Sequence, residues 1–379
     1  MIKRTLQELC LNITDGKHGD CENEENSGYY FISCKDIFDG QINYKNARQI
    51  TKADFEETHK RTMLEVDDIL LTNSGTIGRM AFVTDREATT KTTFQKSVAI
   101  IKPDKQKVLP RYLYYQLQNC VPQFINSSNG SAQKNLLLST MRTFQIGIEE
   151  NREKQEKIAN TLSAYDDLIE NNQKQIKLLE EAARRLYKEW FVDLRFPGYE
   201  NTKIVDGVPE GWRRGLLKEL ISVNYGKDHK KAPDDGNIPV YGSGGLMRKC
   251  NKSLFSGEAV LIPRKGSLNN IMYVDETFWT VDTMFYATMK QPHTAIFVYF
   301  FVKAFDMYSM NIGAAVPSMT TKILDAMDVV IPDKETLEKF DKYAKVYFNK
   351  IKTLQGQNEQ LKTARDLLLA KLMSGEVEV

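Results

Sequence analysis

Several glycine-containing loops of this sequence carry residue types that bind nucleic acid. Lysine and arginine pair with phosphates, whereas asparagine, glutamine, serine, arginine and lysine hydrogen-bond to base edges in the major groove. The candidate DNA contacts in the first half are Lys17, His18, Asn73, Ser74, Thr76, Lys91, Lys96, Asn129, Ser131, Gln133 and Lys134. Those in the second half are Lys227, His229, Lys230, Lys231, Ser243, Arg248, Lys249, Arg264, Lys265, Ser267, Asn269 and Asn270.

The charge distribution indicates two contacts with a polyanion. The net charge is only +2, but residues 79–142 hold ten basic and three acidic side chains, and residues 213–265 hold eleven basic and five acidic ones. Between them, residues 149–189 have eight basic and ten acidic side chains. Two basic patches on either side of a slightly acidic segment favour two binding surfaces. Ordinary solvated faces are the alternative for either patch taken alone.

Other chemistry is poorly supported. The five cysteines are scattered without a CxxC pair, and the four histidines stand alone, so the sequence predicts reduced thiols, no disulfide framework and no metal site. No Pro-Pro occurs, although adenine methyltransferases need an Asn/Asp-Pro-Pro-aromatic motif for the flipped base. The glycine cluster at residues 241–245 lacks a P-loop lysine and predicts a tight turn. We therefore expect catalysis to lie in another chain.

The hydrophobic runs predict a protein of the cytoplasm. The first ten residues have no apolar core of a signal peptide, and the longest apolar run, residues 295–302, is too short to cross a bilayer.

The elements that position these loops are repeated. Residues 6–19 align with 217–229 and share a Gly-Lys pair, Gly16-Lys17 and Gly226-Lys227. Residues 67–80 align with 257–272, and residues 129–137 align with 312–320. Each copy ends in a short apolar strand and a long helix. The sequence thus predicts two globular regions, each followed by a helix, with a joint at residues 195–212.

Both predicted helices have apolar residues at alternating steps of four and three, which is typical of a coiled-coil seam. An antiparallel pairing brings every slot of one helix opposite a slot of the other and sets Asn172 against Asn358. A buried amide pair would fix the register, since a slip would place each amide against leucine. The alternative is that both asparagines interrupt weak heptads. The slots are Ile158, Leu162, Tyr165, Ile169, Asn172, Ile176, Leu179, Ala183, Leu186 and Trp190, then Phe340, Ala344, Tyr347, Ile351, Leu354, Asn358, Leu361, Arg365, Leu368 and Leu372.

Such helices would form a rod. About 40 residues per helix correspond to roughly 60 Å at 1.5 Å per residue. With one basic region at each end in a pseudo-twofold relation, the rod would set the distance between two contacts.

With these features, the chain resembles the specificity subunits of type I restriction–modification enzymes over essentially its whole length. The resemblance is carried by FISCKDI (residues 31–37), DDILLTNSGTIG (67–78), the helix at 153–198, VPEGW (208–212) and LLLAKLMSGEV (367–377). Two departures are visible. PRKGSLN (263–269) stands where the family usually has a TIG-type loop, and the segments 148–150 and 331–333 lack a proline-rich run.

The resemblance implies an α+β fold with two globular α/β target recognition domains, at residues 1–150 and 213–332. They would be joined by antiparallel spacer helices at 151–194 and 333–375, with a linker at 195–212. It also implies a non-catalytic chain without a cofactor that binds a bipartite site in double-stranded DNA. Two methyltransferase subunits using S-adenosylmethionine would dock on the spacer, and restriction–translocation subunits would join them. We expect Tyr187, Lys188 and Tyr343 on the outer helix faces to contact the methyltransferase subunits. The alternative function is a coiled-coil adaptor that binds no DNA.

Overall fold

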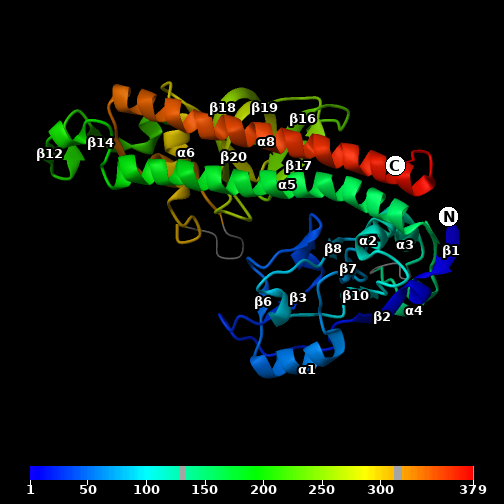
Figure 1. The fold of residues 1–379 in the computed structure, drawn as a ribbon. Helices are drawn as coiled ribbons and strands as arrows, with labels where there is room; N and C mark the ends of the chain where they lie inside the picture. The colour runs from blue at the N-terminus through cyan, green and yellow to red at the C-terminus, as the bar shows by residue number, and fades with distance from the viewer. Residues whose placement is uncertain (129–133, 311–317, 379) are drawn as a thin grey trace. The chain divides into compact units, whose positions relative to one another are not determined.

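The computed structural model describes residues 1–128, 134–310 and 318–378. The chain forms two compact units, each with its own sheets and with a part of both long helices (Figure 1). Unit 1 comprises residues 1–171 and 358–379, and unit 2 comprises residues 172–357.

Unit 1 is built around a four-stranded antiparallel sheet and a three-stranded mixed sheet. The first has the order β2 (Cys10–Asp15), β10 (Val98–Pro103), β7 (Ile69–Thr72) and β8 (Met80–Phe82), and the second has β6 (Arg48–Gln49), β3 (Tyr30–Ile32) and β9 (Thr92–Phe94). The smaller pairs are β1 (Ile2–Thr5) with β11 (Gln145–Ile148) and β4 (Ile37–Phe38) with β5 (Gln41–Ile42). The helices are α1 (Lys52–Thr62), α2 (Pro110–Asn119), α3 (Val121–Asn126) and α4 (Leu138–Thr143), with 3-10 turns at Leu6–Leu9, Cys34–Asp36 and Thr89–Lys91.

Unit 2 contains a six-stranded sheet. Its order is β15 (Ile221–Tyr225), β20 (Met284–Met289), β18 (Phe255–Pro263), β19 (Met272–Thr280), β16 (Ile238–Gly242) and β17 (Gly245–Cys250). Two further pairs are β14 (Arg213–Leu216) with β21 (Asp328–Ile331) and β12 (Ile204–Val205) with β13 (Val208–Pro209). The helices are α6 (Ala295–Lys303) and α7 (Thr321–Asp325), with 3-10 turns at Tyr199–Asn201, Leu217–Glu219 and His229–Lys231.

The central strands are almost wholly apolar because their side chains enter hydrophobic clusters on both faces of the sheet. In β7, Ile69 and Leu71 belong to the hydrophobic cluster that contains α2, whereas Leu70 belongs to a second cluster. In β18, Val260 packs into the cluster that contains α6, whereas Leu261 packs into another cluster. Because successive side chains of a strand point to opposite faces, a sheet covered on both faces needs an uninterrupted apolar run.

The two units share one topology, which confirms the internal repeat. In each, a β-strand pairs in parallel with a second strand, β3 with β9 and β16 with β19. The long strand β19 also pairs with β18, as β8 pairs with β7. The single strand β19 of unit 2 thus makes both pairings that β8 and β9 make separately in unit 1, where residues 83–91 lie between these two strands.

The predicted helices are present as α5 (Arg152–Tyr187), continued by a π-helical turn at Lys188–Val192, and α8 (Lys334–Ser374). All of their seam positions are buried or half-buried, as the period of the sequence predicted. Within unit 1, Ile158 shares a hydrophobic cluster with Leu372. Within unit 2, the rings of Trp190 and Phe340 lie 5.8 Å apart. The contact between Trp190 and Phe340 follows the predicted antiparallel register.

Asn172 and Asn358 are 8% and 6% exposed. The division between the units falls immediately before each of them in the sequence. Their pairing across the seam stays a prediction.

The expected outer position of Tyr187 is wrong. Its side chain is 8% exposed and belongs to the core of unit 2, where its ring lies 5.3 Å from that of Phe300 and 5.4 Å from that of Phe191. Tyr187 is next to the seam position Leu186, and α6 of unit 2 covers this side of the helix, which a count of heptads in the long helices cannot show. Tyr343 is exposed, as is Lys188, which pairs with Asp193.

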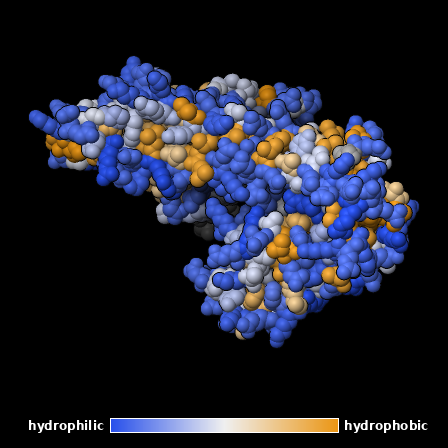
Figure 2. Space-filling model, in the orientation of Figure 1, coloured by the Kyte–Doolittle hydropathy of each residue, from blue (hydrophilic) through white to orange (hydrophobic). Residues whose placement is uncertain are grey.

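The segment at residues 195–212 contains local structure of its own. Phe196 and Trp212 are buried in the core of unit 2, and β12 and β13 form a hairpin. Ile204 and Val205 in this hairpin are 52% and 64% exposed, and Figure 2 shows a group of hydrophobic residues over β12.

Candidate nucleic-acid interface

Loops from distant parts of the sequence meet at one end of the unit 1 sheets. We define the first loop cluster as residues 16–19, 33–36, 73–79, 95–97 and 134–136. The Lys17 N–H donates to the Phe94 carbonyl (2.8 Å), and the Lys96 N–H donates to the Lys17 carbonyl (3.1 Å). The Asn73 N–H donates to Ser97 (3.1 Å), while its carbonyl accepts from Leu136 (2.8 Å). The Cys34 N–H donates to the Ser97 hydroxyl (3.2 Å). Backbone bonds thus hold the cluster together.

A second loop cluster has the same construction in unit 2. It comprises residues 226–231, 242–245, 264–270, 281–283 and 318–319. The Lys227 N–H donates to Thr280 (2.9 Å), the Arg264 N–H donates to Thr283 (2.8 Å), and the Arg264 carbonyl accepts from Met319 (2.9 Å). These bonds make Lys227 the counterpart of Lys17 and Arg264 the counterpart of Asn73. The PRKGSLN loop therefore keeps the backbone frame of the TIG-type loop although its side chains differ.

Glycine is required at the same place in both clusters. A Cβ atom at Gly16 would lie 1.9 Å from the carbonyl oxygen of Phe94, and a Cβ atom at Gly226 would lie 2.0 Å from that of Val281. No side chain fits at such distances. The Gly-Lys pair that revealed the repeat therefore marks a close approach of two backbone segments.

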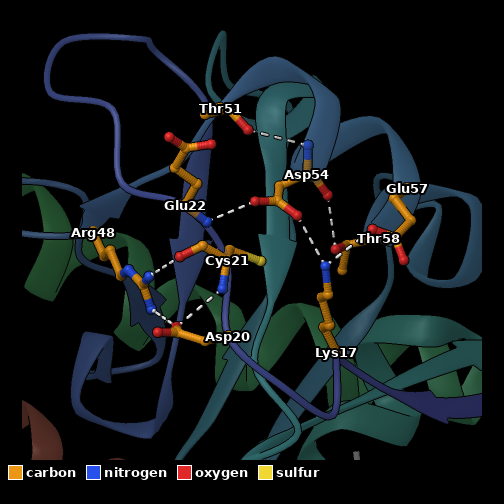
Figure 3. A network of polar contacts seen from close by, with 9 residues as sticks. All are labelled: Lys17, Asp20, Cys21, Glu22, Arg48, Thr51, Asp54, Glu57 and Thr58. Atoms are coloured by element: carbon orange, nitrogen blue, oxygen red, sulfur yellow. Dashed lines mark hydrogen bonds and ion pairs between the residues drawn. The ribbon is translucent and has the colours of Figure 1, made fainter.

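Lys17 contacts acidic groups of its own unit (Figure 3). Its ammonium lies 2.9 Å from Asp54 and 3.0 Å from Glu57, and these hydrogen bonds raise the pKa of Lys17. Its side chain is 20% exposed. Lys17 thus ties the first loop cluster to α1, and its charge is balanced within the protein.

The loop after Lys17 is fixed by the same network (Figure 3). The Glu22 N–H donates to Asp54 (2.6 Å), and this bond together with Lys17 lowers the pKa of Asp54. The Arg48 guanidinium donates to Asp20 (2.6 Å), lowers the pKa of that carboxyl, and also bonds the Cys21 carbonyl. The loop is thereby bonded to both α1 and β6.

The other predicted residues of unit 1 differ in exposure. His18 is 59% exposed and bonds Asp15 (2.9 Å) through Nε2. Asn73 is only 4% exposed, and its Oδ1 has no hydrogen-bond partner among the residues that the structure describes. Lys91 precedes β9, so it lies at the opposite end of this strand from Lys96. Asn129, Ser131 and Gln133 lie outside the described residues. Thr76, Lys96 and Lys134 are exposed in the cluster, and Ser74 is half-buried.

Unit 2 also has exposed cations in and beside its cluster. Arg248 is fixed by bonds to Asp234 and to the carbonyls of His229 (2.5 Å) and Ala232 (2.7 Å). The Arg264 guanidinium lies 5.4 Å from the exposed ring of Tyr225. The exposed predicted residues are Lys227, Lys230, Lys231, Lys249, Lys265, Ser267 and Asn269, and the half-buried ones are His229, Ser243, Arg248, Arg264 and Asn270.

Two asparagines of unit 2 fix the loop backbone. Asn269 donates to Asp306 (2.9 Å) and accepts from the Met307 N–H (2.8 Å). Asn270 donates to the Ser243 carbonyl (2.9 Å). These amides hold the 264–270 loop in place.

Several cluster residues were missed by the sequence reasoning. Lys35, Arg79 and Asn135 are exposed in the first cluster. In the second, Asp282 is exposed, and the hydroxyl of Tyr308 donates to the Gly266 carbonyl (3.1 Å). For Lys35, Arg79 and Asp282, only their positions after strands β3, β7 and β19 could have indicated a role. The repeat aligned these strands without showing which ends meet.

Other kinds of site are not indicated. The glycine cluster at 241–245 is the tight turn that the sequence predicted, joining β16 to β17. All five cysteines are free. Among the described residues there is no group of three potential metal ligands. In the same ranges, no helix has the length and apolar character to span a membrane.

Comparison with known proteins agrees with this construction. The model of the type I restriction modification DNA specificity domain matches residues 3–181 and 209–363. The MjaIX specificity subunit of Methanocaldococcus jannaschii is 26% identical, and the alignment covers 92% of this chain and 87% of that protein. A putative type I specificity subunit of Mycoplasma genitalium is 24% identical over 71% of this chain and 72% of its own length.

The fold has also been seen before. The crystal structure of a type I restriction-modification S subunit from M. genitalium superposes with a TM-score of 0.58 at 18% identity, covering 98% of this chain and 95% of that one. None of these relatives supports the adaptor that binds no DNA. The chain therefore belongs to the family of specificity subunits of type I restriction–modification enzymes, the non-catalytic subunits through which these enzymes recognise DNA sequence.

Proposed function

We propose that the first and second loop clusters each read one half of a split site in double-stranded DNA. One observation carries this proposal. The same backbone frame is built twice, with Asn73 and Arg264 at one equivalent position and Ser74 and Lys265 at the next. A shared frame with different side chains suits two readers of different sequences.

The fixed frame has an energetic role. Loops already held by backbone bonds lose little conformational entropy on binding, so more of the contact energy is retained as affinity. Exposed cations such as Lys96, Lys134 and Lys265 would bind phosphates and give affinity that falls with salt. Polar side chains in the same loops would then bond base edges in the major groove.

Methylation and cleavage are assigned to partner chains. In this proposal two adenine-N6 methyltransferase subunits, with S-adenosylmethionine, pack on the outer faces of α5 and α8, and restriction subunits join them in the cytoplasm. The exposed Tyr343 and Lys188 are candidate contacts. A buried Asn172–Asn358 pair would hold the register of the helices and so keep the gap between the half-sites constant.

The proposal predicts a methylation pattern. Modified-base sequencing of genomic DNA, from the host with and without this gene, should show N6-methyladenine in a two-part motif with a fixed gap that disappears on deletion. Restoring the wild-type gene should restore the same motif. Co-purification of a methyltransferase with the chain gives an independent test of the partners. An unchanged methylation pattern, together with no such partner, would contradict the proposal.

A further inference from the structure

Two consecutive apolar side chains are exposed at the edge of the second loop cluster, directly after its 242–245 segment. Leu246 is 60% and Met247 is 54% exposed, directly after the Ser243-Gly244 turn between β16 and β17. Single exposed apolar residues are ordinary on protein surfaces. Two adjacent ones, among loops of lysine, serine, asparagine and glycine, suggest that an apolar group of a ligand meets them.

A β-bulge places both side chains at this surface. Tyr241 pairs with Leu246 and Val240 with Arg248, so Met247 is the extra residue of β17. Consecutive side chains of a regular strand point to opposite faces, and a bulge redirects one of them. Met247 also lies close to Gly242, where a Cβ atom would be 2.4 Å from its Sδ. The absence of a side chain at Gly242 therefore leaves room for the Met247 thioether.

Two basic loops are tied to the hairpin. The Asn270 amide donates to the Ser243 carbonyl (2.9 Å) and links the turn to the loop that carries Lys265. Arg248 bonds the His229 carbonyl (2.5 Å) and links β17 to the turn that carries Lys231. Both lysines are exposed. The apolar pair is thus adjacent to cations that suit a phosphate backbone.

We infer that Leu246 and Met247 contact the 5-methyl group of a thymine in the half-site read by unit 2. That methyl is the apolar group that base edges offer in the major groove, and apolar side chains recognise it by direct contact. The inference rests on the proposed function, since it requires the second loop cluster to lie on DNA. It adds two specificity-determining residues that the polar candidates do not include.

Unit 1 supplies an internal control. After β3, the described chain continues into the 3-10 turn Cys34–Asp36 and β4, so no tight hairpin with an apolar pair corresponds to Leu246 and Met247 there. Sensitivity to a thymine methyl through this pair is therefore expected in one half-site only.

The test replaces thymine by uracil, which lacks the 5-methyl group. The full chain is bound to duplexes that carry its methylation motif, with deoxyuridine replacing each thymidine of the motif in turn. At one position of one half-site, the wild type should bind about fourfold more weakly, the factor expected for losing contact with one methyl group. The Leu246→Ala/Met247→Ala double variant should bind the thymine and uracil duplexes equally.

Two further variants separate the contact from general effects. Leu178→Ala removes another exposed apolar side chain, on α5, and should keep the full sensitivity to uracil. Gly242→Ala should displace Met247 and reduce the sensitivity without removing any atom of the pair. Substitution of uracil in the other half-site should affect the wild type and the double variant alike.

The outcomes distinguish the two proposals. If the wild type prefers its motif but no thymine of either half-site shows a methyl effect that the double variant abolishes, the contact inferred here is overturned while the proposed function stands. The same holds if the motif contains no thymine. If the wild type does not distinguish its motif from a scrambled duplex, the proposed function itself fails and the inference fails with it.

Discussion

Asn151 and Asp333 are equivalent N-caps of the two long helices, α5 and α8. Asn151 Oδ1 accepts from the N–H groups of Glu153 (2.9 Å) and Lys154 (3.1 Å). Asp333 Oδ1 accepts from the Thr336 N–H (2.9 Å), and its other oxygen accepts from the Trp212 indole N–H (2.9 Å). The caps occupy equivalent positions of the repeat, but only Asp333 also holds a buried tryptophan.

Removing these caps should destabilise the protein unequally. Asn151→Ala is expected to lower the free energy of unfolding by about 1 kcal/mol, the usual value for a lost helix cap. Asp333→Ala should cost about 2 kcal/mol or more, because the Trp212 N–H also loses its partner. Urea denaturation measures both. Lys339→Ala, which removes only an exposed ion pair with Glu335, is the control and should cost well under about 1 kcal/mol. Equal losses in all three variants would contradict the cap assignment.

The cap at Asp333 should also depend on pH. Burial opposes ionisation of this carboxyl, but hydrogen bonds from Thr336 and Trp212 outweigh it and lower the pKa of Asp333. A group whose folded pKa is below its unfolded one stabilises the protein above the unfolded pKa, and this contribution is lost as pH falls through the folded pKa. The advantage of the wild type over Asp333→Asn should therefore shrink below about pH 4. A constant difference in unfolding free energy over that range would exclude this titration.

The two framework glycines should be equally intolerant of substitution. Gly16→Ala and Gly226→Ala each force a methyl group against a backbone carbonyl and should cost about 3 kcal/mol or more, at the upper end of overpacking effects. Gly244→Ala is the matched control, since nothing lies within 4 Å of a Cβ atom there. Thermal and urea unfolding test the three variants. Tolerance at one glycine but not at the other would mean that the frames are less alike than their hydrogen bonds indicate.

Lys17 and Lys96 should respond differently to loss of charge. Lys17→Met removes an ammonium that is already paired with Asp54 and Glu57, so binding should weaken through a displaced loop with little change in salt dependence. Lys96→Met removes an exposed ammonium and should lower the slope of log K against log salt by about 1 if it contacts a phosphate. Binding to the duplex motif at several salt concentrations measures both slopes. A larger change of slope for Lys17 would reverse the two roles.

Arg264 tests the reading of bases in unit 2. Its guanidinium is half-buried beside Tyr225, which limits its motion and favours a defined contact. Arg264→Ala should relax the motif at one position, at a cost of about 1–3 kcal/mol if the contact is bidentate to guanine. Selection from a randomised duplex library reports the motif. Unchanged motif and unchanged affinity would remove Arg264 from the interface.

The sequence predicted those features that depend on local patterns. The seam of the long helices follows from their period, and the turn at 241–245 follows from its glycines. The repeat was visible because Gly16 and Gly226 are each forced by a backbone contact. These patterns can be recognised in one sequence because a glycine in a close backbone contact, or an apolar residue in a heptad, can be replaced by few other residue types.

Features that depend on distant contacts were not predictable in this way. Nothing near Lys17 in the sequence shows that Asp54 and Glu57 neutralise it, because α1 is brought there only by the fold. Asn73 lies in a polar, glycine-containing segment that is typical of a surface loop. Its side chain is nevertheless buried where the 73–79 and 95–97 segments meet. A polar residue type fixes what a side chain is able to bond, while tertiary packing decides whether it reaches the surface.

Unit 1 is completed by residues that are synthesised after every residue of unit 2. Its core contains Ile158 and Leu162 from α5 together with Leu369, Leu372 and Met373 from α8. On the ribosome, the first globular region must therefore wait with this apolar face uncovered until α8 has emerged, a stage at which nascent chains bind chaperones. A product truncated before residue 358 would contain every residue of unit 2 and leave unit 1 open to proteolysis. Both units are therefore complete only in a chain that has been translated through α8.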